Sequence, residues 1–216
     1  MSDEADEYTA LRVALLDEPL VLPPPLVRAP TGPGAVAVED LVEATALSVR
    51  ESLPTVGVGG GSVAMLTAKD VRLDRPPSRR GSAEVTGALT VRAGDVLMVM
   101  GADGAVRVCD RDGVLLGPGI QLLRGHPETL DPWFLACVLR AALEAADGKP
   151  FDLYQVRVPR ISLEEQRCRG AAFRHLLELE SSWRRRRASI ERVVRAGVDG
   201  LATGTLLPTA ADRDGE

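Results

Sequence analysis

Residues 162–195 read SLEEQRCRGAAFRHLLELESSWRRRRASIERVVR, and this stretch decides the fold of the C-terminal part of the chain. Ser162 is a candidate N-cap, and Glu165 stands three residues later, at the spacing of a capping box. No proline follows until Pro208, so the pattern predicts one helix from Leu163 to the end of the stretch. At 1.5 Å per residue such a helix is about 50 Å long, which is too long to be buried in a domain of this size.

Side chains recur along this predicted helix with a 4-3 spacing at Ala172, Leu176, Leu179, Trp183, Arg186, Ile190 and Val193. This spacing is typical of a coiled-coil seam, here with one basic interruption at Arg186. A stripe this narrow needs another helix beside it. We therefore expect a helix-pairing seam made of Leu176, Leu179, Trp183, Ile190 and Val193.

Charge is distributed unevenly along the chain. The 216 residues carry a net charge of -5, which argues against a strongly basic protein. However, residues 160–195 contain ten Arg and five Glu, and residues 69–80 contain one Lys and four Arg against two Asp. A protein that is acidic on average can still present a basic face.

The length fits one sizeable domain with an appendage. Proline- and glycine-rich composition marks a linker before residue 35. The expected parts are an N-terminal arm and linker at 1–34, a mixed α/β (α+β-like) domain at 35–158, a long helix with a turn at 159–207, and a disordered tail at 208–216. Within the arm, the apolar run Leu11–Leu16 is compatible with an edge strand on the domain or with a partner-binding arm.

Turn signals organise the predicted domain. Asp103-Gly104 predicts a hairpin after the apolar strand Val96–Met100, and Asp112-Gly113 predicts a second hairpin that ends in Val114–Leu116. Asp131 followed by Pro132 predicts the start of a helix that runs to about Ala146. Asp95 is explained by a turn that leads into the apolar strand.

An arginine- and proline-rich stretch at residues 71–82 predicts an exposed loop. The candidate DNA-binding residues in and beside it are Lys69, Arg72, Arg75, Arg79 and Arg80. The guanidinium fork of arginine donates parallel hydrogen bonds to phosphate oxygens and to guanine. A solvated loop without a partner is the alternative. The glycine-rich run at residues 57–62 lacks the Lys-Ser/Thr pair of a phosphate-binding loop and indicates a flexible loop.

Catalytic and metal-binding patterns are absent from the sequence. His126 and His175 stand far apart, without GxSxG or HExxH motifs. Cys109, Cys137 and Cys168 have no zinc-ligand spacing and are expected to be reduced. We expect no catalytic residue, metal or cofactor. The sequence has no signal peptide or membrane span, which favours a cytoplasmic protein, associated with the nucleoid when bound to DNA.

Several short motifs, taken in order, resemble the specificity subunits of type I restriction–modification systems. Residues 91–98, VRAGDVLM, are similar to the strand entry of a target-recognition domain, and residues 130–135, LDPWFL, to a helix of that domain. Residues 156–167, VRVPRISLEEQR, resemble the junction between the domain and the spacer helix, and residues 200–207 resemble the end of that helix. The resemblance covers about residues 35–207.

The resemblance implies a non-catalytic module that reads a short DNA half-site. Its long helix would pair with that of a second recognition domain, in a homodimer or another chain, and would dock a DNA methyltransferase subunit. Similar domains accompany bacterial N-6 adenine methyltransferases, but this sequence lacks their (Asp/Asn)-Pro-Pro-aromatic motif. The alternatives are an interaction adaptor of the same fold that does not bind DNA and an enzyme with an unrecognised site.

Overall fold

The computed structural model describes residues 2–28, 32–52, 60–101 and 103–208. The chain divides into two compact units: one joins Met1–Pro25 with His175–Glu216, and the other comprises Leu26–Arg174. Part of the glycine-rich run (57–59) and nearly all of the expected tail (209–216) lie outside the described residues. The mixed α/β fold with a long C-terminal helix is confirmed.

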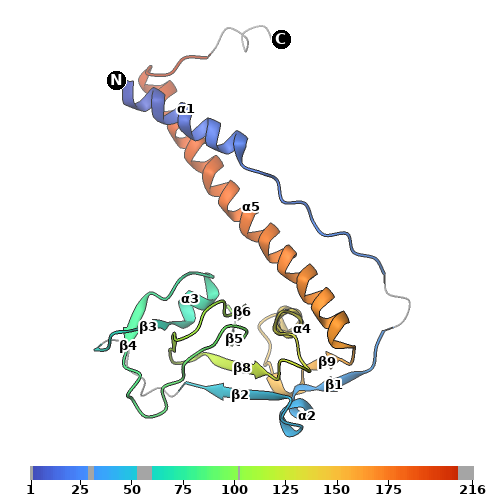
Figure 1. The fold of residues 1–216 in the computed structure, drawn as a ribbon. Coiled ribbons are helices and arrows are strands. Elements are labelled where there is room, and N and C mark those ends of the chain that lie inside the picture. The colour runs from blue at the N-terminus through green and yellow to red at the C-terminus, as the bar shows by residue number, and fades with distance from the viewer. Residues whose placement is uncertain (1, 29–31, 53–59, 102, 209–216) are drawn as a thin grey trace. The chain divides into compact units, whose positions relative to one another are not determined.

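Unit Leu26–Arg174 contains most of the secondary structure (Figure 1). Its elements are β1 (Ala35–Ala37), α2 (Val38–Glu43), β2 (Leu47–Glu51), β3 (Val63–Leu66), α3 (Ala68–Arg72), β4 (Arg79–Gly81), β5 (Val96–Val99), β6 (Ala105–Val108), β7 (Leu115–Leu116), β8 (Gln121–Gly125), α4 (Pro132–Ala146), the 3-10 helix η1 (Leu153–Gln155), β9 (Arg157–Pro159) and the beginning of α5 (Leu163–Thr203).

The strands form three sheets. An antiparallel sheet has the order β2-β8-β5-β6, a second sheet has the order β4-β3-β7, and β1 pairs with β9. The predicted hairpin at Asp103-Gly104 is confirmed, because β5 and β6 pair with Val99 opposite Ala105. Gly104 packs closely against α4: a Cβ there would lie 2.6 Å from a methyl carbon of Leu143, so the Leu143 side chain would have to shift.

Buried leucines and valines join the two larger sheets. Leu97 of β5 stands opposite Leu122 of β8, so both side chains point to one face of the sheet. On that face they share a buried cluster with Val71 of α3 and Leu116 of β7. This apolar contact positions the α3–β4 segment against the larger sheet.

Two local predictions were wrong. Asp112-Gly113 does not close a hairpin, because Leu115 and Leu116 pair in parallel with β3 instead of returning along β6. Residues 71–82 are not simply an exposed loop: they include the end of α3, the buried Val71 and the strand β4, which pairs with β3.

The predicted starts of two helices, at Asp131 and at Ser162, are confirmed. The Asp131 carboxylate caps α4 by accepting a hydrogen bond from Phe134 N at 2.8 Å. The Ser162 hydroxyl accepts one from Glu165 N at 3.2 Å at the start of α5, which continues to Thr203. The Glu165 carboxylate forms an ion pair with Arg169.

Buried contacts hold the start of α5 on the domain. The Gln166 side chain, 6% exposed, accepts a hydrogen bond from Asp131 N at 3.0 Å and donates to the carbonyl of Thr129 at 3.1 Å. Gly170 is needed nearby, because a Cβ there would lie 2.9 Å from Trp133 Cβ. The junction expected at residues 156–167 therefore joins α4 to α5 through buried contacts of Gln166 and Gly170. We call these contacts the clasp.

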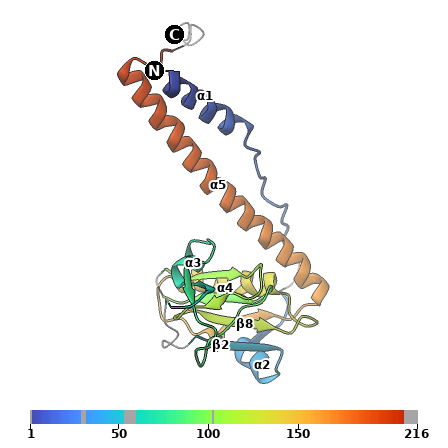
Figure 2. The ribbon, with the colours of Figure 1, turned by 60° about the vertical axis from the view of Figure 1, so that its left-hand side comes forward.

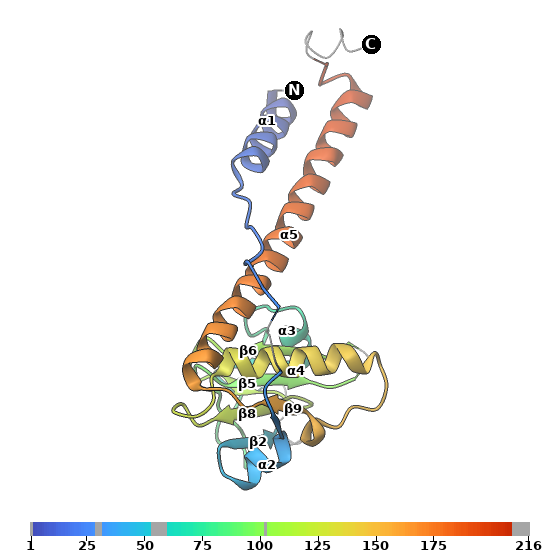
Figure 3. The ribbon, with the colours of Figure 1, turned by 90° about the vertical axis from the view of Figure 1, so that its right-hand side faces the viewer.

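The other unit consists of α1 (Ser2–Asp17), the segment that follows it, and the distal part of α5 (Figure 2, Figure 3). The edge-strand alternative for Leu11–Leu16 is wrong, since this run is helical. Tyr8 lies against Gly197, and Arg186 donates a hydrogen bond to the carbonyl of Glu18 at 3.3 Å. These two contacts indicate that α1 runs antiparallel to α5.

Candidate nucleic-acid interface

The predicted basic segment is organised around one buried carboxylate, that of Asp70. Thr67 and Asp70 form a capping box at the start of α3. The same carboxylate accepts hydrogen bonds from Ser78 N at 3.2 Å and Ser78 Oγ at 2.8 Å, and it forms an ion pair with Arg75. The chain from α3 to β4 is therefore fixed from within.

These contacts decide the charge state of Asp70. Its side chain is fully buried, and burial by itself raises the pKa of a carboxyl group. The hydrogen bonds from Thr67, Arg75 and Ser78 outweigh burial and lower the pKa of Asp70 well below its ordinary value of 3.8. Asp70 is consequently ionised throughout the physiological pH range.

The five predicted DNA-binding residues differ in their availability. The exposed side chains of Lys69 and Arg79 form no hydrogen bond or ion pair with other described residues. Arg75 is engaged with Asp70. Arg72 and Arg80 are exposed, but each donates to a backbone carbonyl: Arg72 to Asp103 at 2.8 Å and Arg80 to Ser62 at 2.6 Å.

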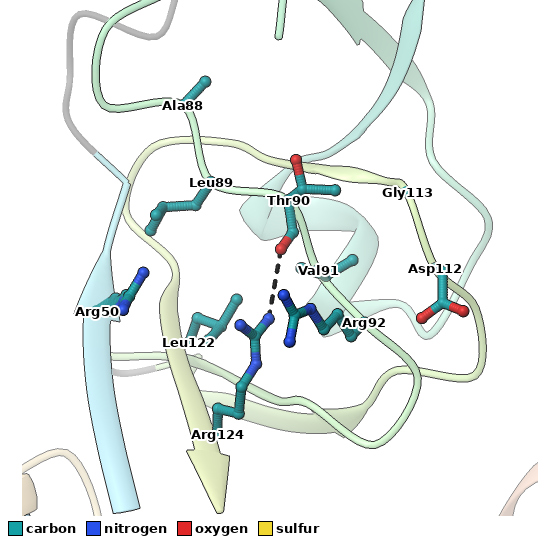
Figure 4. Close-up of a pocket in the computed structure, with 10 residues that line it drawn as sticks. All are labelled: Arg50, Ala88, Leu89, Thr90, Val91, Arg92, Asp112, Gly113, Leu122 and Arg124. Atoms are coloured by element: carbon teal, nitrogen blue, oxygen red, sulfur yellow. Dashed lines mark hydrogen bonds between the residues drawn. The ribbon is translucent and has the colours of Figure 1, made fainter.

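A second group of arginines surrounds a cavity of about 590 Å³, shown in Figure 4. Arg50 lies on β2, Arg92 on the turn before β5, and Arg124 on β8. We call this the arginine cavity; its lining residues are Arg50, Ala88, Leu89, Thr90, Val91, Arg92, Asp112, Gly113, Leu122 and Arg124. None of its three arginines was predicted as a site residue.

Strand pairing explains why Arg50 and Arg124 lie at the same cavity. Arg50 stands directly opposite Leu122, and Arg124 stands two residues further along β8. Because side chains alternate across a strand, Arg50, Leu122 and Arg124 point to the same face of the sheet. The missed signal is the alternation of residues 48–51 and 121–124, which becomes visible only once β2 is paired with β8.

Asp95 fixes one side of the arginine cavity. Its carboxylate, 2% exposed, accepts hydrogen bonds from Arg124 Nε at 2.7 Å and Nη2 at 2.6 Å. It also accepts one from Arg92 N at 2.7 Å. The turn predicted at Asp95 is present, and the same residue also orients Arg124.

The predicted seam residues fall on two faces of α5. Leu176, Trp183 and Ile190 are exposed, with 69% of Trp183 accessible, whereas Leu179 and Val193 are half-buried. The half-buried face continues through Arg186 and Gly197, the two positions at which contacts with the α1 segment are described. The exposed face, which we call the uncovered stripe, consists of Leu176, Trp183, Ile190, Val194, Val198 and Leu201.

Neither protein-family profiles nor curated proteins match this sequence. Solved structures do match. A chain from a type I restriction–modification system, solved in work on complex assembly and conformational transition, is 21% identical with a TM-score of 0.57 and covers 92% of this chain. The HsdS subunit from Thermoanaerobacter tengcongensis is 21% identical with a TM-score of 0.52 and covers 90%. This chain has the type I specificity-subunit fold.

This chain corresponds to part of each solved chain. The chain spans about half of the two solved chains, 52% of the first and 51% of the second. It contains one mixed α/β unit and one long helix. Within the described part of this fold, no helix is both long and apolar enough to cross a membrane.

Proposed function

We propose that this chain is a non-catalytic DNA sequence-recognition module of a bacterial restriction–modification system. The observation that carries the proposal is the specificity-subunit fold, which extends over nine-tenths of the chain. In this reading, unit Leu26–Arg174 binds a DNA half-site. Contacts with phosphates supply affinity, and hydrogen bonds to base edges supply sequence choice.

The exposed side chains of the α3–β4 segment form one part of the proposed DNA surface. Lys69 and Arg79 are available for phosphate contacts, and Arg72 and Arg80 keep guanidinium donors beyond their single backbone contact. Arg75 supports this surface through Asp70. We expect it to influence DNA binding through the position of the segment.

The long helix supplies the proposed protein contacts. We propose that a second recognition unit, from another copy or from a different chain, pairs with this one through the long helix. The uncovered stripe on α5 offers an apolar surface for this pairing. A DNA methyltransferase subunit, which would methylate adenine, is the further partner that we propose.

The proposal can be tested by selecting from a random-sequence duplex library at two salt concentrations, with the full chain alone and with a methyltransferase encoded beside it. We expect enrichment of a defined half-site and weaker binding at the higher salt concentration. Failure to enrich any sequence under all four conditions would contradict DNA recognition.

An adaptor without DNA affinity is the second candidate, favoured by the net charge of -5. It would bind its partner through α5 only. In the same experiment it would enrich no sequence, and its association with the methyltransferase would survive mutation of Lys69 and Arg79.

A further inference from the structure

The three arginines of the arginine cavity differ in how firmly their side chains are held. Arg124 is held by two hydrogen bonds to Asp95, and its Nη2 also contacts the carbonyl of Thr90 at 3.4 Å. By contrast, the exposed side chains of Arg50 and Arg92 form no hydrogen bond or ion pair with other described residues. Figure 4 shows the guanidinium groups of Arg92 and Arg124 side by side in this view, and Arg50 lines the same cavity from β2.

The charge balance at this cavity favours an anion. Three arginines line or enter it, against the carboxylates of Asp112 and Asp95. Asp95 is occupied by Arg124, and one oxygen of Asp112 accepts a hydrogen bond from Ala93 N at 2.8 Å. Thus Arg50 and Arg92 present donors that no described acidic side chain satisfies.

The polarity of the lining residues limits which ligand the cavity can bind. Val91 and Leu122, both nearly fully buried, contribute apolar atoms to its lining and cannot satisfy a polar ligand. Thr90 also lines the cavity and can donate one hydrogen bond through its hydroxyl, but the arginines supply most of the side-chain donors. Guanidinium groups bind phosphate oxygens through paired, charge-assisted hydrogen bonds, and a phosphate group fits between several such forks.

We propose that the arginine cavity is a phosphate-binding site, and that its ligand is a backbone phosphate of DNA. This inference rests on the proposed function and adds a specific site to it. Arg50 and Arg92 contact the phosphate oxygens, whereas Arg124, fixed by Asp95, forms the rigid wall against which the phosphate is positioned. The site is separate in sequence from the α3–β4 segment.

The test compares the full-length R50Q/R92Q variant with wild type in binding a labelled random-sequence duplex across a range of salt concentrations. Each phosphate contact contributes about 0.9 to the slope of log affinity against log salt concentration. We expect the variant to bind about tenfold or more weakly at low salt and its slope to fall by about one to two.

Two further variants make the test specific. R160Q/R167Q removes the same charge from exposed arginines that do not line the cavity, and it should change the slope less than R50Q/R92Q does. R50K/R92K keeps both charges and should retain most of the slope while losing the paired hydrogen bonds. Thermal melting of every variant checks that the fold is kept.

Inorganic pyrophosphate serves as a second probe that distinguishes DNA from a small phosphate ligand. If wild type binds the duplex and R50Q/R92Q binds it equally well with the same slope, the cavity proposal is overturned while DNA recognition stands. If wild type binds pyrophosphate but not the duplex, and the variant binds neither, the phosphate site stands and the proposed function fails. Binding of neither probe by wild type overturns both.

Discussion

Arg124 places two of its guanidinium nitrogens on the two carboxylate oxygens of Asp95, at 2.7 and 2.6 Å. The hydrogen bonds that Arg124 donates to Asp95 raise the pKa of Arg124 further above its already high value, despite its partial burial. Asp95 also accepts a hydrogen bond from Arg92 N. One carboxylate therefore positions the side chain of Arg124 and the backbone of Arg92 at the same cavity.

Replacing Asp95 with Asn should destabilise the domain. The variant removes the negative charge opposite Arg124, which is 28% exposed, but keeps an oxygen that can accept from Arg92 N. Loss of one partner from a buried pair leaves an uncompensated charge, so we expect the free energy of unfolding to fall by about 2–4 kcal/mol. Urea denaturation at neutral pH measures the change.

Asp110→Asn is the matched control. Asp110 pairs with Arg111, and both side chains are more than half exposed, so its loss should cost no more than about 0.5 kcal/mol. Equal effects of the two substitutions would show that the Asp95–Arg124 pair has no special structural role.

Asp70 should make the stability of the domain depend on acidic pH. Its pKa is lower in the folded chain than the ordinary value of 3.8 expected after unfolding, so its contribution is fully present above that value. The contribution is lost as the pH falls below 3.8 toward the folded-state pKa. Asp70→Asn should therefore cost about 2 kcal/mol or more at pH 7, and this difference should shrink at pH 3.

Urea midpoints of wild type and Asp70→Asn at several pH values between 7 and 3 test this dependence. Asp74→Asn serves as control: Asp74 is 65% exposed, so its ion pair with Arg107 should contribute less than about 1 kcal/mol, and Asn tolerates its positive φ of 45°. A constant difference between wild type and Asp70→Asn over this pH range would refute the predicted titration.

Gly170→Ala should loosen the clasp between α4 and α5. The added Cβ would collide with the Asp131 carboxylate that caps α4 and would lie 3.0 Å from Phe134 N. Because part of this obstruction is backbone, we expect a loss of about 1–3 kcal/mol in unfolding free energy. Gly32→Ala, where a Cβ meets no atom within 4 Å, should stay within about 0.5 kcal/mol of wild type in the same thermal or urea melts. Similar stabilities of the two variants would contradict this reading.

Trp183→Arg should weaken helix pairing more than it weakens folding. Trp183 is 69% exposed, so the substitution removes little packing within the chain while placing a charge in the uncovered stripe. We expect self-association, or docking of the methyltransferase, to weaken tenfold or more, since buried Trp residues dominate interfaces. Sedimentation equilibrium measures the association constant. Arg185→Ala, on the opposite side of α5, is the control. An unchanged association constant for Trp183→Arg would remove the stripe from the interface.

Local signals in the sequence were sufficient for some elements. The caps at Asp131 and Ser162 and the hairpin at Asp103-Gly104 depend on residues within a few positions of each other. Such interactions depend on the spacing of nearby residues and not on how distant segments pair. The resemblance to type I specificity subunits supplied the overall architecture, and the shared fold confirmed it.

Pairings between distant residues could not be predicted. β2 has only five residues, including Arg50 and Glu51, and is defined by its pairing with β8, seventy or more positions away along the chain. The Asp112-Gly113 turn was misinterpreted for the same reason, because Leu115 pairs with Met65. The arginine cavity depends on both pairings, so its residues could not be grouped from spacing alone.

The seam illustrates a different limit. A 4-3 spacing identifies an apolar side of a helix but does not tell how many partners share it. Here Leu179 and Val193 lie on the half-buried face and Trp183 lies on the exposed face. That division depends on α1, whose helical state was not predicted from Leu11–Leu16.

The packing of α1 on α5 has a consequence for the proposed assembly. A helix with two free apolar faces can bind a neighbour on each side and can therefore add further copies without end. With its half-buried face in use within the chain, α5 offers the uncovered stripe alone. If copies of the chain pair through that stripe, as proposed above, each copy covers the stripe of the other and the assembly closes as a pair. In that case, the packing of α1 on α5 prevents the addition of further copies.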